Sequence, residues 1–537
     1  MKGIKQLLMG SLVVLCALPG LAQYGYYHDV LTFGQTQIGG TARMRSFGGA
    51  QTALGGDLSN AGGNPAGLGF FNRSTFAFSP VFNFNTVQSD YLGSKRQGFE
   101  SALKVGHMGA VFFYGKDEAT AGKWRGGSLG ISINRIKNFN HQAEMDGYNN
   151  MSSIINSFVE NPEGAYADAA YDHFIINPHE YNYQFDEGFG EILGYDTTDF
   201  IGYSSPYETS VPRQQMSVKT NGGQYAINLG YGGNYDDKIY MGANLGIQTI
   251  DYTRRTIYTE SEYFVVEERN GDEVLGYGDD ALDHLRIEDN IYISGAGVNL
   301  SMGVIVRPLN FLTVGATFQT PTALALSEES SYDFTTSYYD KFDYTLVEFD
   351  TYDADNDPST QYLYTTYDLQ NLDNNPYLSD IYSSNYYITT PGRINLGAAV
   401  FLGKRGFLTA DAELVDYGSS RVGSEDFVAT EDNDVIKDIY KAAMNYRLGG
   451  ELRLDKFRFR GGFAFEGDPF AESNVDRTRM EATTGFGYRN KDFYLDVMAG
   501  HKWYNTFITP YEVSFDAPEA KISTAQETLN ITFGLNF

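Results

Sequence analysis

The feature that most constrains this chain is a long series of segments in which apolar residues alternate with small or polar ones. Residues 529–537 show it most clearly, with Leu, Ile, Phe, Leu and Phe at every second position and Asn, Thr, Gly and Asn between them. Successive side chains of a β-strand point to opposite faces, so this segment has one apolar face and one polar face. A strand between lipid and an aqueous lumen needs this pattern.

Similar segments recur from residue 75 onward and predict an antiparallel transmembrane β-barrel of about 14 strands. A soluble β-sandwich is the alternative, but it would need both strand faces covered or one face fully polar. The mean hydropathy of −0.34 is too low for a bundle of membrane-spanning helices. The expected strands are 75–84, 103–114, 128–137, 224–232, 239–252, 294–306, 311–326, 393–400, 407–417, 446–454, 457–465, 479–488, 493–500 and 529–537.

The connections between these strands alternate between short turns and long loops, as in outer-membrane barrels. The long loops are rich in Asp, Glu, Tyr and Asn, so we expect them outside the cell and expect them to carry most of the net charge of −29. Such an acidic surface argues against a nucleic-acid partner. Short helices are expected within the loops at 151–159 and 434–444, and the long loops themselves are 138–219, 254–289, 327–386, 421–441 and 504–525.

Residues 1–22 have the pattern of a secretory signal peptide, with Lys2 and Lys5 before an apolar run that is too short to span a membrane comfortably. The single cysteine, Cys16, lies in this run. A lipoprotein anchor is the alternative, although Leu15 is a poor residue before a lipidated cysteine. We therefore expect export to the outer membrane, contact with its lipids, and recognition of the last strand, which ends at Phe537, by barrel-assembly machinery.

The stretch 48–71, between the signal and the first strand, is dominated by Gly, Ala, Ser and Asn. It predicts a compact plug, comprising residues 23–74, inside the lumen of a barrel formed by residues 75–537. Residues 24–40 show no clear period, and 41–54 predicts a short helix that Gly48 and Gly49 weaken. Apolar anchors of the plug are expected to line a ligand path, and they are Phe47, Leu54, Leu58, Leu68, Phe70 and Phe71.

Asn64 and Pro65 form an N-cap followed by a first helical residue. With Ala66, Gly67 and Leu68 they match the Asn-Pro-Ala motif at the end of the N-terminal hatch in the FadL/TodX family, which the chain resembles over its mature length. Further matching pieces are Thr320-Pro321, 390–393, 446–451, 460–462 and 468–470.

The resemblance implies an outer-membrane barrel of about 14 strands that is plugged by its N-terminal residues. An even number of strands is typical of bacterial barrels. It also implies transport of long-chain fatty acids or other hydrophobic compounds. The ligand would pass from an external groove to an internal pocket and leave through a gap in the wall. A hatch role transfers only to Asn64, Pro65, Ala66, Gly67 and Leu68.

The sequence motifs that would indicate catalysis or metal binding are incomplete. Gly126–Gly130 matches the G-x-S-x-G pattern, but Ser128 begins a strand instead of standing in a strand–turn–helix elbow. The acidic run 353–357 resembles a calcium loop, yet Pro358 replaces the turn glycine, so either a solvated loop or loose Ca²⁺ bridging is possible. His173 and His179 form the one close histidine pair and are expected to be exposed. We expect no enzyme activity, no metal site and no cofactor.

Arg458 and Arg460 share the lumenal side of one strand. They could attract a ligand carboxylate or form ion pairs with acids of the plug or barrel. Two functions remain open. One is transport of a hydrophobic small molecule by binding, hatch rearrangement and diffusion, which an apolar internal cavity and a wall gap would favour. The other is an interaction barrel whose loops bind a protein or secretion partner, which a polar lumen and a sealed wall would favour.

Overall fold

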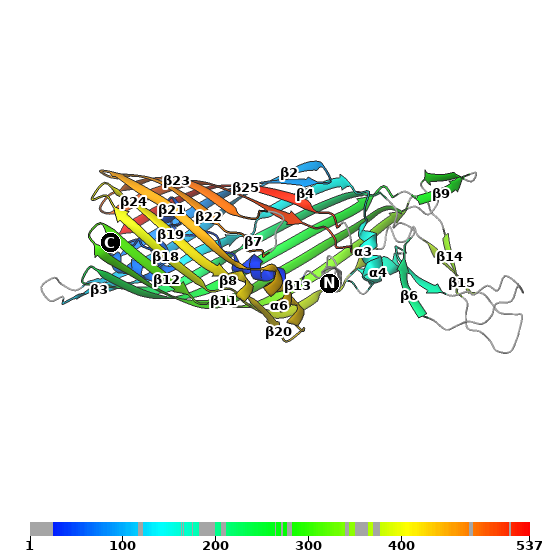
Figure 1. Cartoon of the computed structure of the whole chain (residues 1–537), viewed down its shortest axis with the longest axis horizontal. Helices are drawn as coiled ribbons and strands as arrows, with labels where there is room; N and C mark the ends of the chain where they lie inside the picture. Colours follow the sequence, from blue (N-terminus) through cyan, green and yellow to red (C-terminus); the bar gives the residue numbers. More distant parts are fainter. Residues whose placement is uncertain are drawn as a thin grey trace, which may run out of the picture.

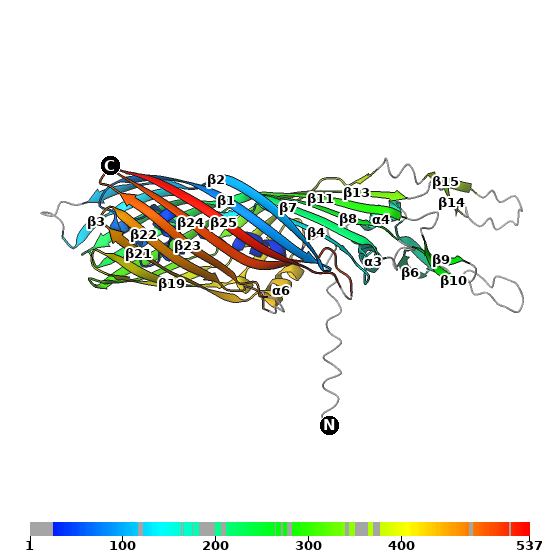
Figure 2. The same ribbon diagram turned by 90° about the horizontal axis from the view of Figure 1, so that it is seen from above.

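The computed structural model is dominated by one closed antiparallel β-barrel, in which the first strand pairs with the last (Figures 1 and 2). Following the pairings around the sheet gives 14 wall positions within the described residues. This confirms the predicted fold class. The structure describes residues 25–115, 122–162, 164, 166–173, 175–181, 199–205, 211–263, 265–269, 272–276, 282–338, 343–348, 363–368, 376–471, 476–514 and 517–537. The expected signal peptide and the acidic run 353–357 lie outside them.

Most wall positions are single strands, and four are built from two consecutive strands. The single strands are β1 (Thr75–Tyr91), β2 (Ser94–Gly115), β7 (Arg213–Tyr235), β8 (Ile239–Ser261), β11 (Leu282–Leu309), β21 (Ala442–Leu454), β22 (Phe457–Glu466), β23 (Arg479–Arg489), β24 (Phe493–Ile508) and β25 (Ala520–Asn536). The divided ones are β3 (Trp124–Asn138) with β4 (His141–Tyr148), β12 (Leu312–Gln319) with β13 (Ala323–Tyr338), β17 (Tyr382–Thr389) with β18 (Arg393–Phe401), and β19 (Gly406–Asp416) with β20 (Arg421–Ser424).

The strands have their apolar side chains outside and their polar side chains inside. On β25, Phe533 and Leu535 are each 43% exposed, whereas Asn530 and Thr532, at alternating positions just before them, are fully buried. This is the reverse of a soluble sandwich, and it is the arrangement that a lipid-facing wall requires. The alternation in the sequence therefore predicted the fold correctly.

Many strands are longer than the sequence predicted. β1 and β2 meet at a tight turn of Leu92 and Gly93, both with positive φ, instead of ending near residues 84 and 103. β8 continues to Ser261 and β13 to Tyr338, so parts of the expected long loops are paired strand. Beyond the apolar belt the outward side chains are polar, such as Gln88, and the inward ones mix apolar and polar types, such as Val87 and Ser89. Pairing therefore continues after the apolar-out, polar-in alternation has ended.

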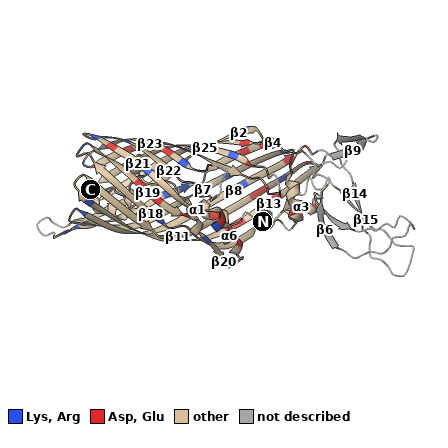
Figure 3. Ribbon diagram, in the orientation of Figure 1, with Lys and Arg blue, Asp and Glu red and all other residues tan. Residues whose placement is uncertain are grey.

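Short turns lie at the end of the barrel that carries the C-terminus. The helices within residues 154–172 lie toward the other end, and the helix at residues 430–439 lies between the two (Figure 1). Asp236 and Asp237 close the β7–β8 turn with φ of 57° and 51°. Figure 3 shows Lys and Arg residues around this end. Loop helices are α3 (Ile154–Glu160), α4 (Ala167–Asp172) and α6 (Thr430–Ile439), and smaller loop elements are β5 (Asn177–Tyr181), β6 (Asp199–Ser204), β9 (Val265–Arg269), β10 (Asp272–Gly276), β14 (Asp343–Glu348), β15 (Leu363–Asp368), β16 (Tyr377–Leu378) and η3 (Tyr417–Ser419).

The helix expected at 151–159 corresponds to α3, and the one expected at 434–444 begins earlier and ends before β21. Within the described part of the chain, no helix combines the length and the apolar character needed to cross a membrane.

Candidate functional site

The N-terminal segment, residues 25–71, lies against the inner face of the wall and contacts strands on all sides. It contains α1 (Tyr27–Gly34), α2 (Ala42–Arg45), η1 (Leu58–Ala61) and η2 (Pro65–Phe70). Its backbone exchanges hydrogen bonds with inward-facing side chains of β25, β19, β12 and β23. These bonds are Ala42 N to Thr532 Oγ1 at 2.7 Å, Thr52 N to Asp411 Oδ2 at 2.8 Å, Thr313 Oγ1 to Ala53 O at 2.8 Å and Thr483 Oγ1 to Ser46 O at 3.0 Å.

Asn64 caps η2 and attaches it to the wall. Its Oδ1 accepts a hydrogen bond from Ala66 N at 3.1 Å, and its Nδ2 donates to Thr52 O of the same segment at 2.7 Å and to Val304 O of β11 at 3.4 Å. Pro65 occupies the first turn, as predicted, although the helix is of the 3₁₀ type. A Cβ atom on Gly303 of β11 would lie only 1.9 Å from Asn64 Oδ1, so this close approach needs a wall glycine.

The helix predicted over residues 41–54 is reduced to the four residues of α2. The Thr41 side chain caps it by accepting a hydrogen bond from Met44 N, as its polar type favours. Gly48 and Gly49 then adopt φ of 65° and 76° and turn the chain away. A Cβ on Gly48 would lie 2.7 Å from Phe463 O. The glycines therefore end this helix because the backbone must pass close to β22.

The apolar anchors pack against the wall. Phe47 and Leu54 are buried with Met44, Ala399 and Phe407, and Leu58 and Leu68 are buried in a second cluster with Ala77, Val111 and Tyr494. Phe70 stacks on Tyr240 with the ring centroids 3.7 Å apart. Phe70 and Phe71 border an open cleft of about 620 Å³ at the C-terminal end of the barrel, together with Arg458.

Arg458 and Arg460 have different environments. Arg460 is fully buried and pairs with Glu451 Oε2 at 2.8 Å and Asp496 Oδ1 at 2.6 Å. Arg43 of the N-terminal segment also approaches Glu451, at 3.9 Å. Arg458 lies near the β21–β22 turn, where its Nη1 donates to the Asp455 carbonyl at 2.5 Å. The ion-pair interpretation therefore holds for Arg460.

Asp57 joins this network from the N-terminal segment. It accepts a hydrogen bond from Thr41 Oγ1 at 2.8 Å and pairs with Arg43 at 3.5 Å. Burial alone would raise the pKa of Asp57, but Arg43 and the hydrogen bonds from Ser59 and Thr41 outweigh it and hold the pKa below its usual value. The Asp57 carboxylate is therefore charged and holds this part of the segment together.

Helix α1 was not predicted, because it lies within residues 24–40, where the sequence shows no clear period. Its residues Tyr27, Val30 and Phe33 recur at the three-residue spacing that places side chains on one helix face, and all three are buried. They fill what we call the α1 chamber, an inward-facing apolar part of the wall. The wall residues of this chamber are Ile250, Tyr252, Ile293, Leu324, Leu326, Tyr386, Ile388 and Val415. An apolar lumenal surface is unusual in a barrel, and here α1 covers it.

The wall beside this chamber is interrupted. β12 ends at Gln319 and β13 begins at Ala323, while on the neighbouring position β17 ends at Thr389 and β18 begins at Arg393. Gln319 pairs with Arg393 and Ala323 with Thr389, so the two gaps face each other. Pro321 and Pro391 occupy these gaps and have no N–H for the ladder. The next position is divided as well, because η3 separates β19 from β20.

The C-terminal end of α1 lies directly on this wall break, defined by residues 320–322 and 390–392. Arg393 Nη2 donates to Gly34 O at 2.6 Å. A Cβ on Gly34 would lie 3.4 Å from Pro391 Cδ and 3.7 Å from Thr390 Cβ. The helix that fills the apolar chamber therefore also contacts the interrupted part of the wall.

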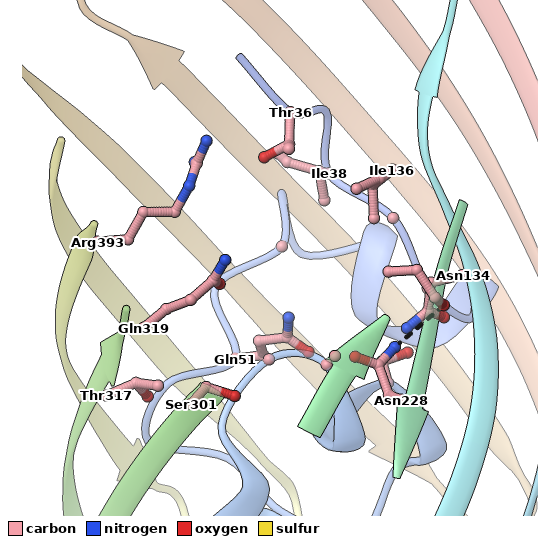
Figure 4. A pocket seen from close by; sticks show the side chains of 18 of the residues that line it. Thr36, Ile38, Gln51, Asn134, Ile136, Asn228, Ser301, Thr317, Gln319 and Arg393 are labelled. Atoms are coloured by element: carbon pink, nitrogen blue, oxygen red, sulfur yellow. Dashed lines mark hydrogen bonds between the residues drawn. The ribbon is translucent and has the colours of Figure 1, made fainter. Parts of the chain in front are cut away.

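A cavity of about 150 Å³ adjoins the chamber (Figure 4). We call it the amide cavity, because most of its lining side chains are amides or hydroxyls, including Gln37, Gln51, Asn134, Asn228, Asn244, Gln248, Asn299, Ser301, Thr317 and Gln319. Figure 4 shows Gln51 from the N-terminal segment and Asn228, Ser301 and Thr317 from the wall around one space. Phe47, Leu54 and Leu58 do not line it. The apolar space is thus occupied by α1, and the space beside it is lined mostly by polar side chains.

The other sequence motifs do not form sites in the described residues. Ser128 lies within the continuous strand β3, so no nucleophile elbow exists there. His173 was expected to be exposed, but this is wrong: it is buried where α4 packs onto β13, and its Nδ1 lies 2.8 Å from Thr336 Oγ1. His179 lies in β5. A group of three or more His, Cys, Asp or Glu side chains suited to a metal ion is absent from the part that the structure describes.

Comparisons with known proteins agree with this architecture. No family model matches the sequence, and no curated protein matches it. Among solved structures, a Pseudomonas aeruginosa FadL homologue aligns with 94% of this chain and 100% of its own, with a TM-score of 0.53 and 11% identity. The P. putida toluene transporter TodX aligns with 93% and 99%, with a TM-score of 0.49 and 10% identity. The chain therefore has the FadL-type outer-membrane barrel fold that the resemblance to the FadL/TodX family predicted.

Proposed function

We propose that this protein carries a small molecule with an apolar body across the outer membrane by binding and diffusion, and that α1 occupies the binding site in the closed state. The observation that carries the proposal is the position of α1, which fills an apolar lumenal chamber and contacts the wall break. The shared fold with a FadL homologue supports a transport role. No covalent step is required.

The exchange of α1 for a ligand is energetically reasonable. Burying a Val or Phe side chain stabilises by roughly 1.5–3 kcal/mol, so Val30 and Phe33 together hold α1 in the chamber with a few kcal/mol. A ligand that covers a similar apolar area, at ~25 cal/mol per Å², can replace that contribution. Ligand binding and α1 docking would therefore compete for the same surface.

We further propose that residues 23–74 act as a plug and that the ligand leaves sideways through the wall break. The hydrogen-bonded segment across the lumen would obstruct a direct path, whereas the break is joined mainly by two hydrogen bonds between Thr322 and Thr390. Each such bond contributes only about 0.5–1.5 kcal/mol net. Separation of the wall at this place is therefore less costly than at a fully paired stretch.

A reversible cross-link tests this proposal. The 3.7 Å between a Cβ on Gly34 and Thr390 Cβ fits the mean Cβ separation of a disulfide, ~3.8 Å. In the double variant Gly34→Cys/Thr390→Cys, oxidation should hold α1 in place and stop uptake of a fluorescent apolar probe such as N-phenylnaphthylamine into proteoliposomes. Reduction should restore uptake.

Each single cysteine variant is the control, because it carries the substitution without the cross-link. Uptake by the oxidised double variant at the rate of these controls would contradict the proposal.

The interaction role is supported by the ordered far end of the barrel. There α3 and α4 pack with β8, β11 and β13 into a buried cluster that includes Ile154, Phe158, Leu285 and Phe334. The Glu260 carboxylate accepts hydrogen bonds from Ile154 N and Gln214 Nε2, both at 2.8 Å. If the loops at this end bind a protein partner, that binding should persist in cells after α1 is cross-linked, whereas transport should stop. The cross-link therefore distinguishes the two functions.

A further inference from the structure

We infer that the molecule which replaces α1 carries a small, neutral, hydrogen-bond-donating head group, and that the amide cavity receives this group. The inference rests on the proposed function, because it describes the ligand of the same site. It concerns a separate part of that site, however: the α1 chamber would hold the apolar body, and the amide cavity would hold the head.

The two spaces are continuous along the wall. On β8, Gln248 lines the amide cavity and Ile250, two residues further on the same face, belongs to the α1 chamber. On β19, Glu413 and Val415 repeat this relationship. The chain segment that follows α1, residues 36–40, lines the cavity directly. A molecule lying along the path of α1 would therefore reach from apolar wall into amide wall.

The cavity presents oxygen atoms without partners in the described residues. Asn244 is 4% exposed, and its Nδ2 donates to Asn228 Oδ1 at 3.1 Å and to Ser301 Oγ at 3.3 Å. These two bonds fix the orientation of the amide and leave Asn244 Oδ1 without a partner. Gln51 Oε1 and Thr317 Oγ1, which line the same cavity, are also unpartnered.

Buried oxygens of this kind call for a donor, since each unsatisfied polar group costs about 1–3 kcal/mol. Hydroxyl groups on a ligand would supply it. An ester or a hydrocarbon, which has no donor, would leave these oxygens unsatisfied.

The charges at the cavity favour a neutral head group. Arg393 and Arg447 line it, and both pair with Glu413, at 3.6 Å and 3.0 Å. Asp411 lies nearby and interacts electrostatically with Arg447. Two cations thus face two carboxylates. An added ligand carboxylate would be close to like charges, and burial would add a desolvation cost that a hydroxyl group does not have.

The size of the cavity limits the head group. A cavity of about 150 Å³ matches the volume that admits a benzene-sized molecule in an engineered protein cavity, roughly six non-hydrogen atoms. A glycerol head group has this size and offers two free hydroxyls when one position is acylated. Monoacylglycerol is therefore a suitable probe for the inferred class.

The test compares three probes with the same acyl chain on the purified, folded barrel. They are 1-monopalmitoylglycerol, methyl palmitate and palmitic acid, and their binding is measured by competition in native mass spectrometry. We expect monopalmitoylglycerol to bind about tenfold more tightly than the other two, the factor that one additional buried hydrogen bond provides. Equal or tighter binding of palmitic acid or methyl palmitate would overturn the inference.

Variants link the preference to the cavity. Asn244→Leu should abolish the preference for monopalmitoylglycerol, and the near-isosteric Thr317→Val, which tests the cavity with less risk to folding, should reduce it. Asn85→Leu is the matched control, because Asn85 is also buried, inward-facing and carries an unpartnered Oδ1, yet it does not line this cavity. A preference that survives both Asn244→Leu and Thr317→Val would also overturn the inference.

The outcome can be separated from that of the proposed function. If the oxidised Gly34→Cys/Thr390→Cys variant loses binding of all three probes, α1 and ligand share a site whichever head group is preferred. If the oxidised variant binds every probe as tightly as the reduced protein does, α1 and the ligand do not share a site. The proposed function is then overturned, whichever head group is preferred.

Discussion

Thr322 and Thr390 join the two sides of the wall break: Thr390 N donates to Thr322 O at 3.0 Å, and Thr322 N donates to Thr390 Oγ1 at 3.2 Å. The second bond uses a side chain where a regular ladder would use a carbonyl. The neighbouring prolines cannot donate, so these two bonds carry most of the local pairing.

Replacing Thr390 by Val removes the acceptor of the second bond while keeping the shape of the side chain. We expect the Thr390→Val variant to exchange the amide hydrogen of residue 322 faster and to take up an apolar probe faster, at a stability cost of about 1 kcal/mol. Hydrogen exchange with mass spectrometry of residues 315–326 measures the first effect.

The matched control for that variant is Thr389→Val, whose side chain is exposed on the outer face. If both variants exchange at the wild-type rate, the Thr390 hydroxyl does not hold the break closed.

The docking of α1 should weaken as pH rises. Tyr386 donates a hydrogen bond to Asp29 Oδ2 at 2.6 Å, but burial dominates and raises the pKa of Asp29 to about 6. A carboxyl with a raised pKa favours docking in its protonated form, so its contribution is complete below pH 3.8 and is lost as pH rises through about 6.

The measurement is maleimide labelling of the Gly34→Cys variant with and without Asp29→Asn. The protein with Asp29 should be labelled faster than the Asp29→Asn protein by a factor that grows several-fold between pH 5 and pH 8, because part of the contribution is still present at pH 5, between 3.8 and about 6. Comparison at equal pH cancels the pH dependence of the thiol itself. A ratio that stays constant between pH 5 and 8 would rule out Asp29 as the controlling group.

Gly303 should be essential for the packing of η2 against β11. Because a Cβ there would lie 1.9 Å from Asn64 Oδ1, Gly303→Ala should displace Asn64 and loosen the segment. We expect a larger single-channel conductance in planar bilayers than the wild-type protein shows. Gly461→Ala is the control, since a Cβ at Gly461 meets only Thr483 O, at 3.9 Å. Unchanged conductance in a folded Gly303→Ala protein would show that η2 does not obstruct the lumen.

Arg460 should contribute to stability, in contrast to Arg458. Replacing Arg460 by Met would leave Asp496, which is fully buried, without its closest cation. Loss of one partner from a buried pair typically costs about 3–5 kcal/mol. Arg458→Met should change stability by about 0.5 kcal/mol or less, because Arg458 is only half-buried and its hydrogen bonds go to the backbone carbonyls of the adjacent turn. Urea unfolding of the two variants in lipid vesicles provides the comparison, and equal midpoints would contradict the assignment.

The sequence predicted the barrel because lipid on one side and polar groups on the other impose a strict period of two, as at Phe533 and Thr532. It also predicted the Asn64 cap, because capping is a local interaction between neighbouring residues. Strand ends such as Tyr91 were missed because the outward residues there are polar and buried apolar residues lie on the inward face instead, so the alternation no longer has the phase of a lipid-facing wall.

The candidate site was mostly missed, because its properties are not local. Tyr27, Val30 and Phe33 form a helix face whose partners lie hundreds of residues away, at Tyr386 and Val415 for example. The phase of the alternation identifies Asn228 and Asn244 as inward-facing, and the β7–β8 hairpin makes them neighbours. The cavity that they line is completed by Gln51 of the N-terminal segment, and this long-range contact has no local signal. Pro321 and Pro391 were visible in the sequence, and only the strand register shows that they occupy facing gaps.

The hydrogen bond from Ala42 N to Thr532 Oγ1 joins residues 490 positions apart and has a consequence for the order of assembly. The last strand must pair with the first around a segment that is synthesised before either of them. If that segment were absent, or folded outside, Thr532 and Asn530 of β25 would lose their hydrogen bonds to Ala42 and Gly40 as the seam closes. Because these bonds form only inside the lumen, we expect the N-terminal segment to be enclosed before the first and last strands pair.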